Sequence, residues 1–216
     1  MNNEYWLKRW TENRIGFHKS GVNPLLEQFL PQVTKVPGRT LVPLCGKSAD
    51  LAWLLSQGHQ VVGVDISEVA ARAFASEQGI AMTGSNEPPF TLFRGERIAY
   101  YVGDFFNLKP DRIGRFDLIY DRAALIALAR DKRPEYAQHL KSLLVSGGQI
   151  LMISLEYDPK KMEGPPFAVT ETELRGLFKE LTMVKLHEYD CIDEESRFKE
   201  RGLDWMKEVV YRVGYL

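Results

Sequence analysis

The sequence predicts an α/β fold with a seven-stranded, mostly parallel sheet, an antiparallel last strand and helices on both faces. Short apolar runs alternate with amphipathic stretches through most of the chain, which is typical of parallel strands joined by helical crossovers. The run from Val61 to Val64 is rich in β-branched residues, as expected of a strand that is buried on both faces. The last two apolar runs, Met183 to Tyr189 and Val209 to Val213, are joined directly by a charged segment, so we expect them to pair antiparallel.

The composition is that of a globular protein with its own hydrophobic core. The chain has 216 residues, of which 44% are hydrophobic and 26% charged, and no linker divides it, so we expect a single domain over 1–216. The formal net charge of -1 gives no electrostatic reason to bind nucleic acid or an anionic membrane. No run approaches membrane-spanning length, and the N-terminus lacks the apolar core of a signal peptide.

The cysteines and histidines argue against a disulfide framework and against a metal site. Cys45 and Cys191 are the only cysteines, which fits a reducing cytosol and predicts a cytoplasmic protein. The four histidines are scattered, and none pairs with a cysteine at metal-site spacing, so we expect no metal. No coiled-coil pattern argues for assembly, and we expect a monomer.

Residues 1–36 are predicted to form a helical cover that precedes the sheet. The segment from Glu4 to Arg14 has the pattern of an amphipathic helix with Trp6 and Trp10 on one side, and a second helix begins at Pro24. Two interpretations of the tryptophans are open. They form a lid over a ligand, or they cover the edge of the sheet.

The stretch from Arg39 to Ser67 is predicted to form strand, turn, helix, turn and strand. Thr40 to Pro43 is the first strand, Ser48 to Gln57 carries leucines on one helical face, and Asp65 follows the second strand at once. An acid in that place, about 20 residues after the first turn, is where nucleotide-binding folds hold the ribose diol. The alternative is that Asp65 is a helix-flanking acid beside Ser67.

The turn at 43–48 contains neither of the common phosphate-binding loops. Gly46 is its only glycine, so a G-x-G-x-x-G motif is absent. Its end, Gly46-Lys47-Ser48, imitates a P-loop, but Leu41 stands where that motif needs a glycine. An adenosine ligand without a phosphate, such as S-adenosylmethionine, needs only a close-packed turn and the ribose acid.

The later elements continue the alternation. We expect a helix from Ser67 to Gln78 ended by Gly79, a loop or an edge hairpin over 83–95, strands at Ile98–Val102 and Phe116–Tyr120, a helix from about Asp131 ended by Gly147-Gly148, a strand at Gln149–Leu155, and a helix at Glu171–Glu180. The proline-rich segment 158–167 follows the fifth strand and suits a wall of the substrate pocket.

Three more candidate residues stand at strand ends. Asp104 and Phe105 follow the third strand, near the place of a bound base, and Arg122 follows the fourth strand at the carboxyl edge, where ligands bind in open α/β folds. The alternatives are a common turn aspartate for Asp104 and a structural salt bridge for Arg122.

Several short segments of the sequence resemble the thiopurine S-methyltransferase family. This family belongs to the class I S-adenosylmethionine-dependent methyltransferases, which have a Rossmann-like sheet. They run in order along the chain: Trp10 with Gly16-Phe17-His18, Pro43-Leu44-Cys45-Gly46-Lys47, Gly58-His59 with Val61-Val62-Gly63-Val64, Phe116-Asp117 with Asp121-Arg122, and Tyr157-Asp158-Pro159 with Gly164-Pro165-Pro166-Phe167.

The resemblance implies a role for each matching residue. Around the cofactor, S-adenosyl-L-methionine, it places Trp10, Leu44, Gly46, Asp65, Asp104, Phe105 and Arg122. Around the acceptor it places Arg122, Arg197, Phe17 and His18. Family members can have glutamate in place of Asp65, and the shorter side chain implies a slightly shifted backbone or a water there.

The expected function is therefore an S-methyltransferase that acts on small aromatic or heterocyclic thiols such as thiopurines, by in-line displacement and without a dedicated general base. The sulfonium of the cofactor already activates the methyl group, so the protein mainly has to align donor and acceptor. Alternatives are methylation of inorganic selenium or tellurium for detoxification, a P-loop-like nucleotide hydrolase that uses Lys47 and Ser48, and a non-catalytic adenosine-binding module.

Overall fold

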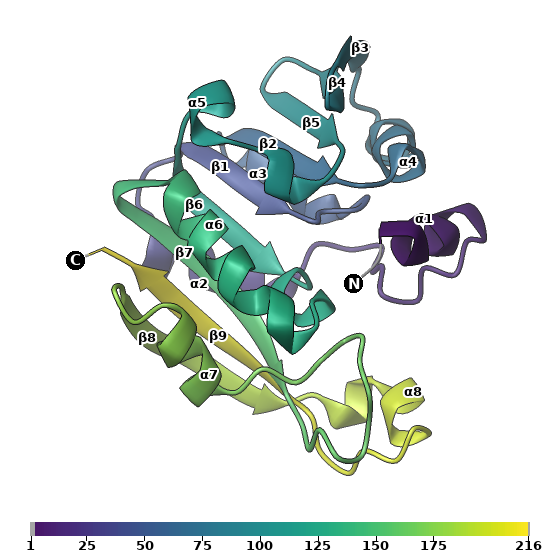
Figure 1. The fold of residues 1–216 in the computed structure, drawn as a ribbon, viewed down its shortest axis with the longest axis vertical. Helices are drawn as coiled ribbons and strands as arrows, with labels where there is room; N and C mark the ends of the chain where they lie inside the picture. The colour runs from purple at the N-terminus through teal and green to yellow at the C-terminus, as the bar shows by residue number, and fades with distance from the viewer. Residues whose placement is uncertain (1–2, 216) are drawn as a thin grey trace.

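One mixed sheet runs through the molecule. In the computed structural model, which describes residues 3–215, the sheet has nine strands in the order β3-β4-β5-β2-β1-β6-β7-β9-β8 (Figure 1). The parallel strands are β1 (Arg39–Pro43), β2 (Gln60–Asp65), β5 (Ile98–Val102), β6 (Phe116–Arg122) and β7 (Leu144–Glu156). The prediction of an α/β fold with a mostly parallel sheet is confirmed.

The antiparallel end of the sheet is confirmed as well. β9 (Lys207–Gly214) lies antiparallel between β7 and β8 (Thr182–Asp190). The chain therefore passes from β7 to the outer strand β8 and returns through β9. Residues 191–206 make this return, and they extend beyond the edge of the sheet (Figure 1).

The predicted count of seven strands is two short. Residues 83–94 form a hairpin of β3 (Thr83–Glu87) and β4 (Phe90–Arg94), and β4 adds antiparallel to β5 at the sheet edge. The phenylalanine and leucine side chains of β4 are buried, whereas β3 is mostly exposed. The polar character of β3 is what one expects of an edge strand, and it explains why the sequence left loop and hairpin both open.

The predicted end of the helix that begins near Asp131 was wrong. α6 (Arg133–Leu143) stops four residues before Gly147, and Gly147-Gly148 lie inside β7. β7 pairs with β6 at Leu144 and again from Gln149, with a register shift between the two places. The glycines thus form an irregularity in a strand instead of a helix cap.

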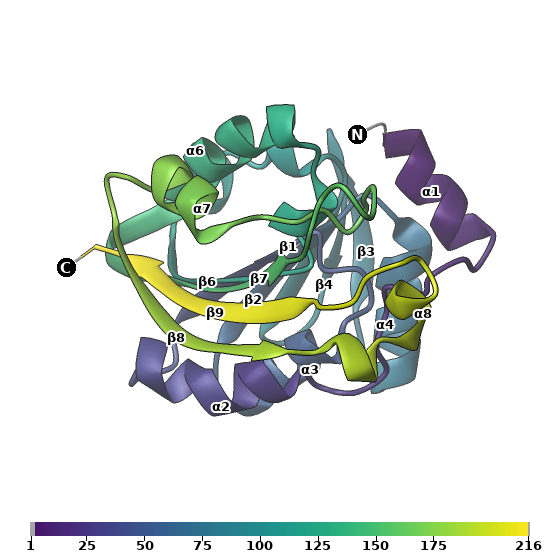
Figure 2. The ribbon, with the colours of Figure 1, turned by 90° about the horizontal axis from the view of Figure 1, so that it is seen from below.

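Two layers of helices bury the sheet. α5 (Pro110–Ile113), α6 and α7 (Glu171–Leu177) share one core with one face of the sheet. α2 (Pro24–Val33), α3 (Ala49–Ser56) and α4 (Glu68–Gln78) share the core on the opposite face (Figure 2). Within residues 3–215, no helix combines the length and apolar character needed to cross a bilayer.

Helix caps explain why two of these helices begin where they do. The Ser48 hydroxyl accepts a hydrogen bond from the backbone N–H of Asp50 at the start of α3, and Ser67 accepts one from Ala70 at the start of α4. Gly79 ends α4 in the left-handed conformation. Both caps fix helix N-termini directly after the carboxyl ends of β1 and β2, so the turns between them are held in place.

Two short helices from opposite ends of the chain lie beyond the carboxyl ends of the parallel strands. They are α1 (Asn3–Thr11) and α8 (Ser196–Lys199) (Figure 1). The predicted cover over residues 1–36 is thus divided: α1 and residues 12–22 lie over the sheet edge, whereas α2 packs on a sheet face.

Candidate active site

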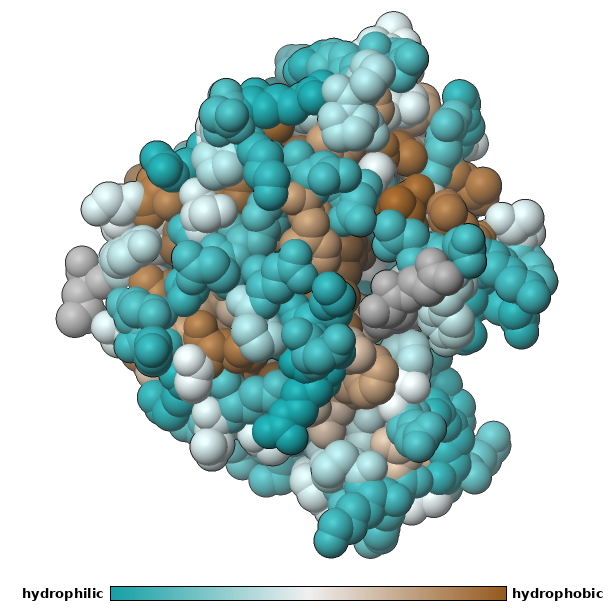
Figure 3. Space-filling model, viewed as in Figure 1, coloured by the Kyte–Doolittle hydropathy of each residue, from teal (hydrophilic) through white to brown (hydrophobic). Residues whose placement is uncertain are grey.

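A cavity of about 820 Å³ opens at the carboxyl ends of the parallel strands. Figure 3 shows a hollow on the side of α1, with brown hydrophobic residues inside it and mostly teal residues around it. All of the residues predicted for the site line this cavity: Trp10, Phe17, His18, Leu44, Gly46, Asp65, Asp104, Phe105, Arg122 and Arg197. The structure brings them together from both ends of the chain and from four strand ends.

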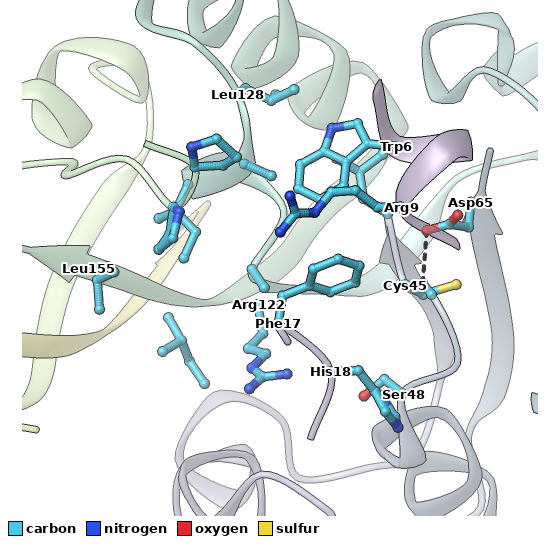
Figure 4. Close-up of a pocket in the computed structure, with 18 of the residues that line it drawn as sticks. Trp6, Arg9, Phe17, His18, Cys45, Ser48, Asp65, Arg122, Leu128 and Leu155 are labelled. Carbon is cyan, nitrogen blue, oxygen red and sulfur yellow. Dashed lines mark hydrogen bonds between the residues drawn. The ribbon is translucent and has the colours of Figure 1, made fainter. Parts of the chain in front are cut away.

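Asp65 is the buried acid of the cavity. It ends β2, and its side chain is 7% exposed. Its Oδ2 accepts a hydrogen bond of 2.9 Å from the N–H of Gly46 (dashed line in Figure 4). Its Oδ1 accepts one of 2.9 Å from the N–H of Ser67. Burial raises the pKa of Asp65 from 3.8 to about 6, although these two bonds lower it. A carboxylate has about four acceptor positions, so two remain for ribose hydroxyls.

The turn after β1 holds the backbone close to the cavity. Leu44 has φ +48° and Gly46 has φ +51°, and a Cβ at Gly46 would lie 2.8 Å from the indole of Trp10. Only glycine fits that contact. Leu44 adopts the left-handed region without being glycine, and such residues are concentrated at functional sites.

An aromatic cluster closes the cavity from the N-terminal side. Trp10 is 6% exposed and meets Phe17 edge to face, with ring centroids 5.6 Å apart. Trp6 meets the same Phe17 ring at 5.3 Å. Trp10 packs directly on the Gly46 turn, so the cover is part of the wall itself and not a loose flap.

The third strand end supplies Asp104 and two phenylalanines. Asp104 Oδ1 accepts a hydrogen bond from the N–H of Phe106, and its Oδ2 accepts one of 3.1 Å from the side chain of Asn3 on α1. The Phe105 ring is 2% exposed and packs against Tyr136 and His139 of α6. Phe106, which sequence reasoning did not single out, is only partly buried and also lines the cavity.

Arg122 ends β6 and faces the cavity from the sheet. It forms no ion pair with any residue in the part of the chain that the structure describes, 3–215. The next residue, Ala123, has φ +60°, and Asp121 is buried, where it accepts hydrogen bonds from the Tyr136 hydroxyl and the N–H of Leu125. Burial raises the pKa of Asp121 to about 6. Asp121 therefore fixes the strained turn that orients Arg122.

Arg197 joins the two ends of the chain above the cavity. It lies in α8, donates a hydrogen bond to the carbonyl of Gly16, and pairs with Glu195 at 3.1 Å. Glu195 also pairs with Lys19 at 2.8 Å. We call this set of four residues, Gly16, Lys19, Glu195 and Arg197, the clasp. It ties residues 12–22 to the return segment 191–206.

The titratable side chains near the turn are held in defined states. Burial and the charge of Lys47 lower the pKa of His18 below 6.5, so its imidazole is neutral at pH 7. Burial and the neighbouring Asp65 raise the pKa of the Cys45 thiol well above its usual value, which leaves Cys45 unsuited to act as a nucleophile. Residues 3–215 contain no cluster of three His, Cys, Asp or Glu side chains that could hold a metal ion.

The P-loop alternative fails on geometry. The Lys47 ammonium pairs with Glu77 of α4 at 2.6 Å, and Ser48 caps α3. Neither side chain is available in the way that a phosphate-binding loop needs.

The proline-rich segment after β7 forms another wall, as expected. Pro165 and Pro166 line the cavity, and the carbonyl of Pro166 accepts a hydrogen bond from Tyr157. The buried Arg133 guanidinium donates to the carbonyl of Ala168 and pairs with Glu173, which anchors the end of the segment.

Several charged residues line the cavity that no sequence pattern pointed to. They include Arg9 on α1, Glu208 on β9, and Glu195 and Arg201 in the return segment. Arg9 is preceded by no motif, and the others lie in or next to the return segment, where periodicity gives no signal.

The fold is that of the class I S-adenosylmethionine-dependent methyltransferases. A 1,6-didemethyltoxoflavin-N1-methyltransferase from Burkholderia thailandensis, solved with S-adenosylhomocysteine, superposes with a TM-score of 0.67 at 18% identity, covering 98% of this chain and 87% of that one. A SAM-dependent methyltransferase from Anabaena variabilis gives a TM-score of 0.66 at 16% identity, with 100% and 96% covered. At these identities the likeness concerns the fold.

The sequence comparisons identify the family within this fold. The profile of the family described as Thiopurine S-methyltransferase matches residues 1–214. Proteins of that name from Azotobacter vinelandii and Bordetella petrii are 43% and 40% identical to this chain, each over 215 residues, with 99% of this chain and 99% and 98% of theirs covered. The chain belongs to the thiopurine S-methyltransferase family, and its cofactor is S-adenosylmethionine.

Proposed function

We propose that this enzyme transfers the methyl group of S-adenosylmethionine to small aromatic or heterocyclic thiols, with thiopurines among them. One observation carries the proposal most directly. The cavity has a buried acid without a phosphate cradle at β2 and an arginine without an ion pair in the described chain at β6, within one largely apolar space. The names of the relatives from Azotobacter vinelandii and Bordetella petrii support thiopurines as one acceptor class.

The residues present suit the cofactor. Asp65 has two acceptor positions left for a ribose, Gly46 leaves room where a Cβ would collide, and no glycine-rich loop is built for a phosphate. We assign Asp65 to the ribose, Leu44 and Gly46 to the methionine part, and Trp10 to the cover above them. We assign Asp104 and Phe105 to the adenine, with Phe106 as a further candidate on that side.

When bound, S-adenosylmethionine supplies a methyl group already activated by its sulfonium. The protein then has to hold the acceptor in line, and well-oriented reactants gain about 7–11 kcal/mol in favourable cases. Arg122 is suited to bind a thiolate by charge-assisted hydrogen bonds, and Phe17 to pack on an aromatic ring. An aromatic thiol ionises near neutral pH, so no general base is needed, and the neutral imidazole of His18 in the cavity wall is suited to accept its proton.

We assign two roles to Arg197: it faces the acceptor, and it holds the N-terminal cover in place. Its guanidinium already binds Gly16 and Glu195, so its contribution is to hold Phe17 and the cover in place as well as to face the acceptor.

We also propose that the protein acts in the cytoplasm as a monomer, consistent with two free, buried cysteines. Light scattering of the purified protein tests the monomer.

The test is a transfer assay with labelled S-adenosylmethionine. Purified protein with 6-mercaptopurine or thiophenol should yield the labelled S-methyl product, with selenite, a selenol and tellurite compared by kcat/KM. A higher kcat/KM for the selenium or tellurium species would replace thiols as the acceptor class. No transfer to any of them, with S-adenosylhomocysteine bound normally, would reduce the protein to a binding module and refute the proposal.

A further inference from the structure

Arg9 is a charged residue of the cavity that the assignments above leave without a role. It lies on α1, is half-buried, and lines the cavity. Figure 4 shows its side chain extending from the side of Trp6 toward the space above Phe17 and Arg122, away from Asp65. Arg9 therefore faces the acceptor side of the cavity and not the ribose side.

The hydrogen bonds of Arg9 are incomplete. Its Nη1 donates to the Tyr5 hydroxyl at 3.1 Å, and the guanidinium lies 5.3 Å from the centre of the Tyr5 ring. Its Nε is buried and has no hydrogen-bond partner among the residues that the structure describes. A buried donor without an acceptor is costly, so the unpaired Nε favours a ligand that supplies one.

Most of the other cations of the cavity form ion pairs. Lys19, Lys47, Lys132 and Arg197 each form an ion pair with a carboxylate. Arg201 donates to the carbonyl of Glu163. Within residues 3–215, Arg9, Arg122 and Arg201 are thus the guanidiniums of the cavity that form no ion pair with a carboxylate, and of these Arg201 is already bonded to a backbone carbonyl.

The geometry of the unused donors selects the kind of anion. Tyr5 occupies Nη1, which leaves the edge formed by Nε and Nη2. Two parallel N–H groups on one edge match the two oxygens of a carboxylate, whereas a thiolate offers a single atom. Arg122, at the end of β6, remains for the sulfur.

We propose that Arg9 is a specificity-determining residue that binds a carboxylate on the acceptor, so that the preferred acceptors are aromatic thiols bearing a carboxylate. This inference rests on the proposed S-methyl transfer and adds the substrate class. Arg122 holds the thiolate, and Arg9 holds the carboxylate on the opposite side of the ring.

The experiment compares matched acceptors and matched variants. The acceptors are 2-, 3- and 4-mercaptobenzoate, each with its neutral mercaptobenzamide. The variants are Arg9→Gln, Arg9→Lys and Lys8→Gln, the last being a control that removes one charge from the neighbouring, exposed position of the same helix. A charge-assisted hydrogen bond predicts that Arg9→Gln lowers kcat/KM for the best carboxylate by about 10- to 100-fold, mainly through KM. The amide should change by less than about threefold, on the same reasoning.

A binding measurement without turnover shows whether Arg9 binds the carboxylate of the acceptor or the carboxylate of the cofactor. Calorimetry of the S-adenosylhomocysteine complex with the S-methylated benzoate product should show a weaker Kd for Arg9→Gln, with partial recovery in Arg9→Lys and none of the loss in Lys8→Gln. Titration with S-adenosylhomocysteine itself should give an unchanged Kd in all variants. A weaker Kd for S-adenosylhomocysteine with unchanged acceptor binding would place Arg9 on the cofactor's carboxylate and overturn the inference.

The remaining outcomes are also decisive. If the wild-type protein methylates the amides as well as the acids, or if Arg9→Gln affects both equally, Arg9 does not recognise a carboxylate, although the proposed function stands. If the wild-type protein methylates no thiol at all, the proposed function fails first.

Discussion

Replacing Asp65 by alanine separates two effects of one carboxylate. If Asp65 binds the ribose, the variant loses a hydrogen bond to a charged group, worth about 1.5–3 kcal/mol. The Kd for S-adenosylhomocysteine should then rise about 10- to 150-fold. The matched variant Asp65→Glu retains a carboxylate and should retain most of the affinity.

The same replacement changes the free energy of unfolding by terms that oppose each other. The N–H groups of Gly46 and Ser67 lose their acceptor, at about 1–3 kcal/mol each. The shift of the Asp65 pKa from 3.8 to about 6 means that the buried ionised carboxylate costs about 3 kcal/mol at neutral pH, and its removal returns that amount. The net loss of stability should therefore be at most about 3 kcal/mol.

Calorimetry with S-adenosylhomocysteine and urea unfolding of the same preparations measure both quantities. A folded Asp65→Ala variant whose Kd lies within twofold of the wild type would show that Asp65 only holds the turn. The ribose assignment would then be wrong.

The pH dependence gives Asp65 a second, independent test. Because its pKa is raised on folding, the folded protein keeps a proton between about pH 4 and 6 that the unfolded chain has lost. Its contribution to stability is thus greatest at low pH and falls as the pH rises through about 6, and Asp121 acts in the same direction. Cofactor affinity should change in the opposite sense, because ribose hydroxyls need the ionised form. The Kd for S-adenosylhomocysteine should rise as the pH falls through about 6, and this rise should disappear in Asp65→Ala; an identical rise in both would contradict the assignment.

The remaining predictions concern the turn, the arginine at β6 and the clasp. Gly46→Ala should lower the free energy of unfolding by about 1–3 kcal/mol, since φ is +51° and the new Cβ would meet Trp10 at 2.8 Å, whereas Gly21→Ala, with open space around it, should not; equal urea midpoints would contradict this. Arg122→Gln should lower kcat/KM at least tenfold while the Kd for S-adenosylhomocysteine changes little; full kcat/KM would make Arg122 structural. Arg197→Ala should raise the acceptor KM and increase hydrogen exchange over 12–22, because Gly16 loses its partner; unchanged exchange would show that the clasp does not hold the cover.

The parts of the fold that the sequence predicted well are those with local causes. β1, β2, β5 and β6 follow from short apolar or β-branched runs, α3 follows from leucines on one helical face, and the end of α4 follows from Gly79. The position of two candidate site residues could also be predicted from a local feature, the end of a strand. Asp65 and Arg122 each follow a strand directly, and the carboxyl ends of parallel strands meet at one edge.

The parts that the sequence did not predict depend on contacts between distant segments. Gly147-Gly148 have the signature of a helix end, but pairing with β6 continues the strand through them. Nothing local marks Arg9 as facing inward, because that depends on where α1 lies on the Gly46 turn. The pairing of Glu195 with Lys19 is equally invisible to periodicity.

The clasp also bears on the order in which the molecule is assembled during translation. The bond between Gly16 and Arg197 joins residues 181 positions apart, so the two partners leave the ribosome at opposite ends of synthesis. Strands β1 to β7 are complete before Arg197 exists, and contacts so distant in sequence form slowly. A nascent chain that ends before Arg197 therefore lacks the clasp, and it also lacks β9, the strand that joins β8 to β7, so its sheet ends at β7 and its cleft is open on the side of residues 12–22.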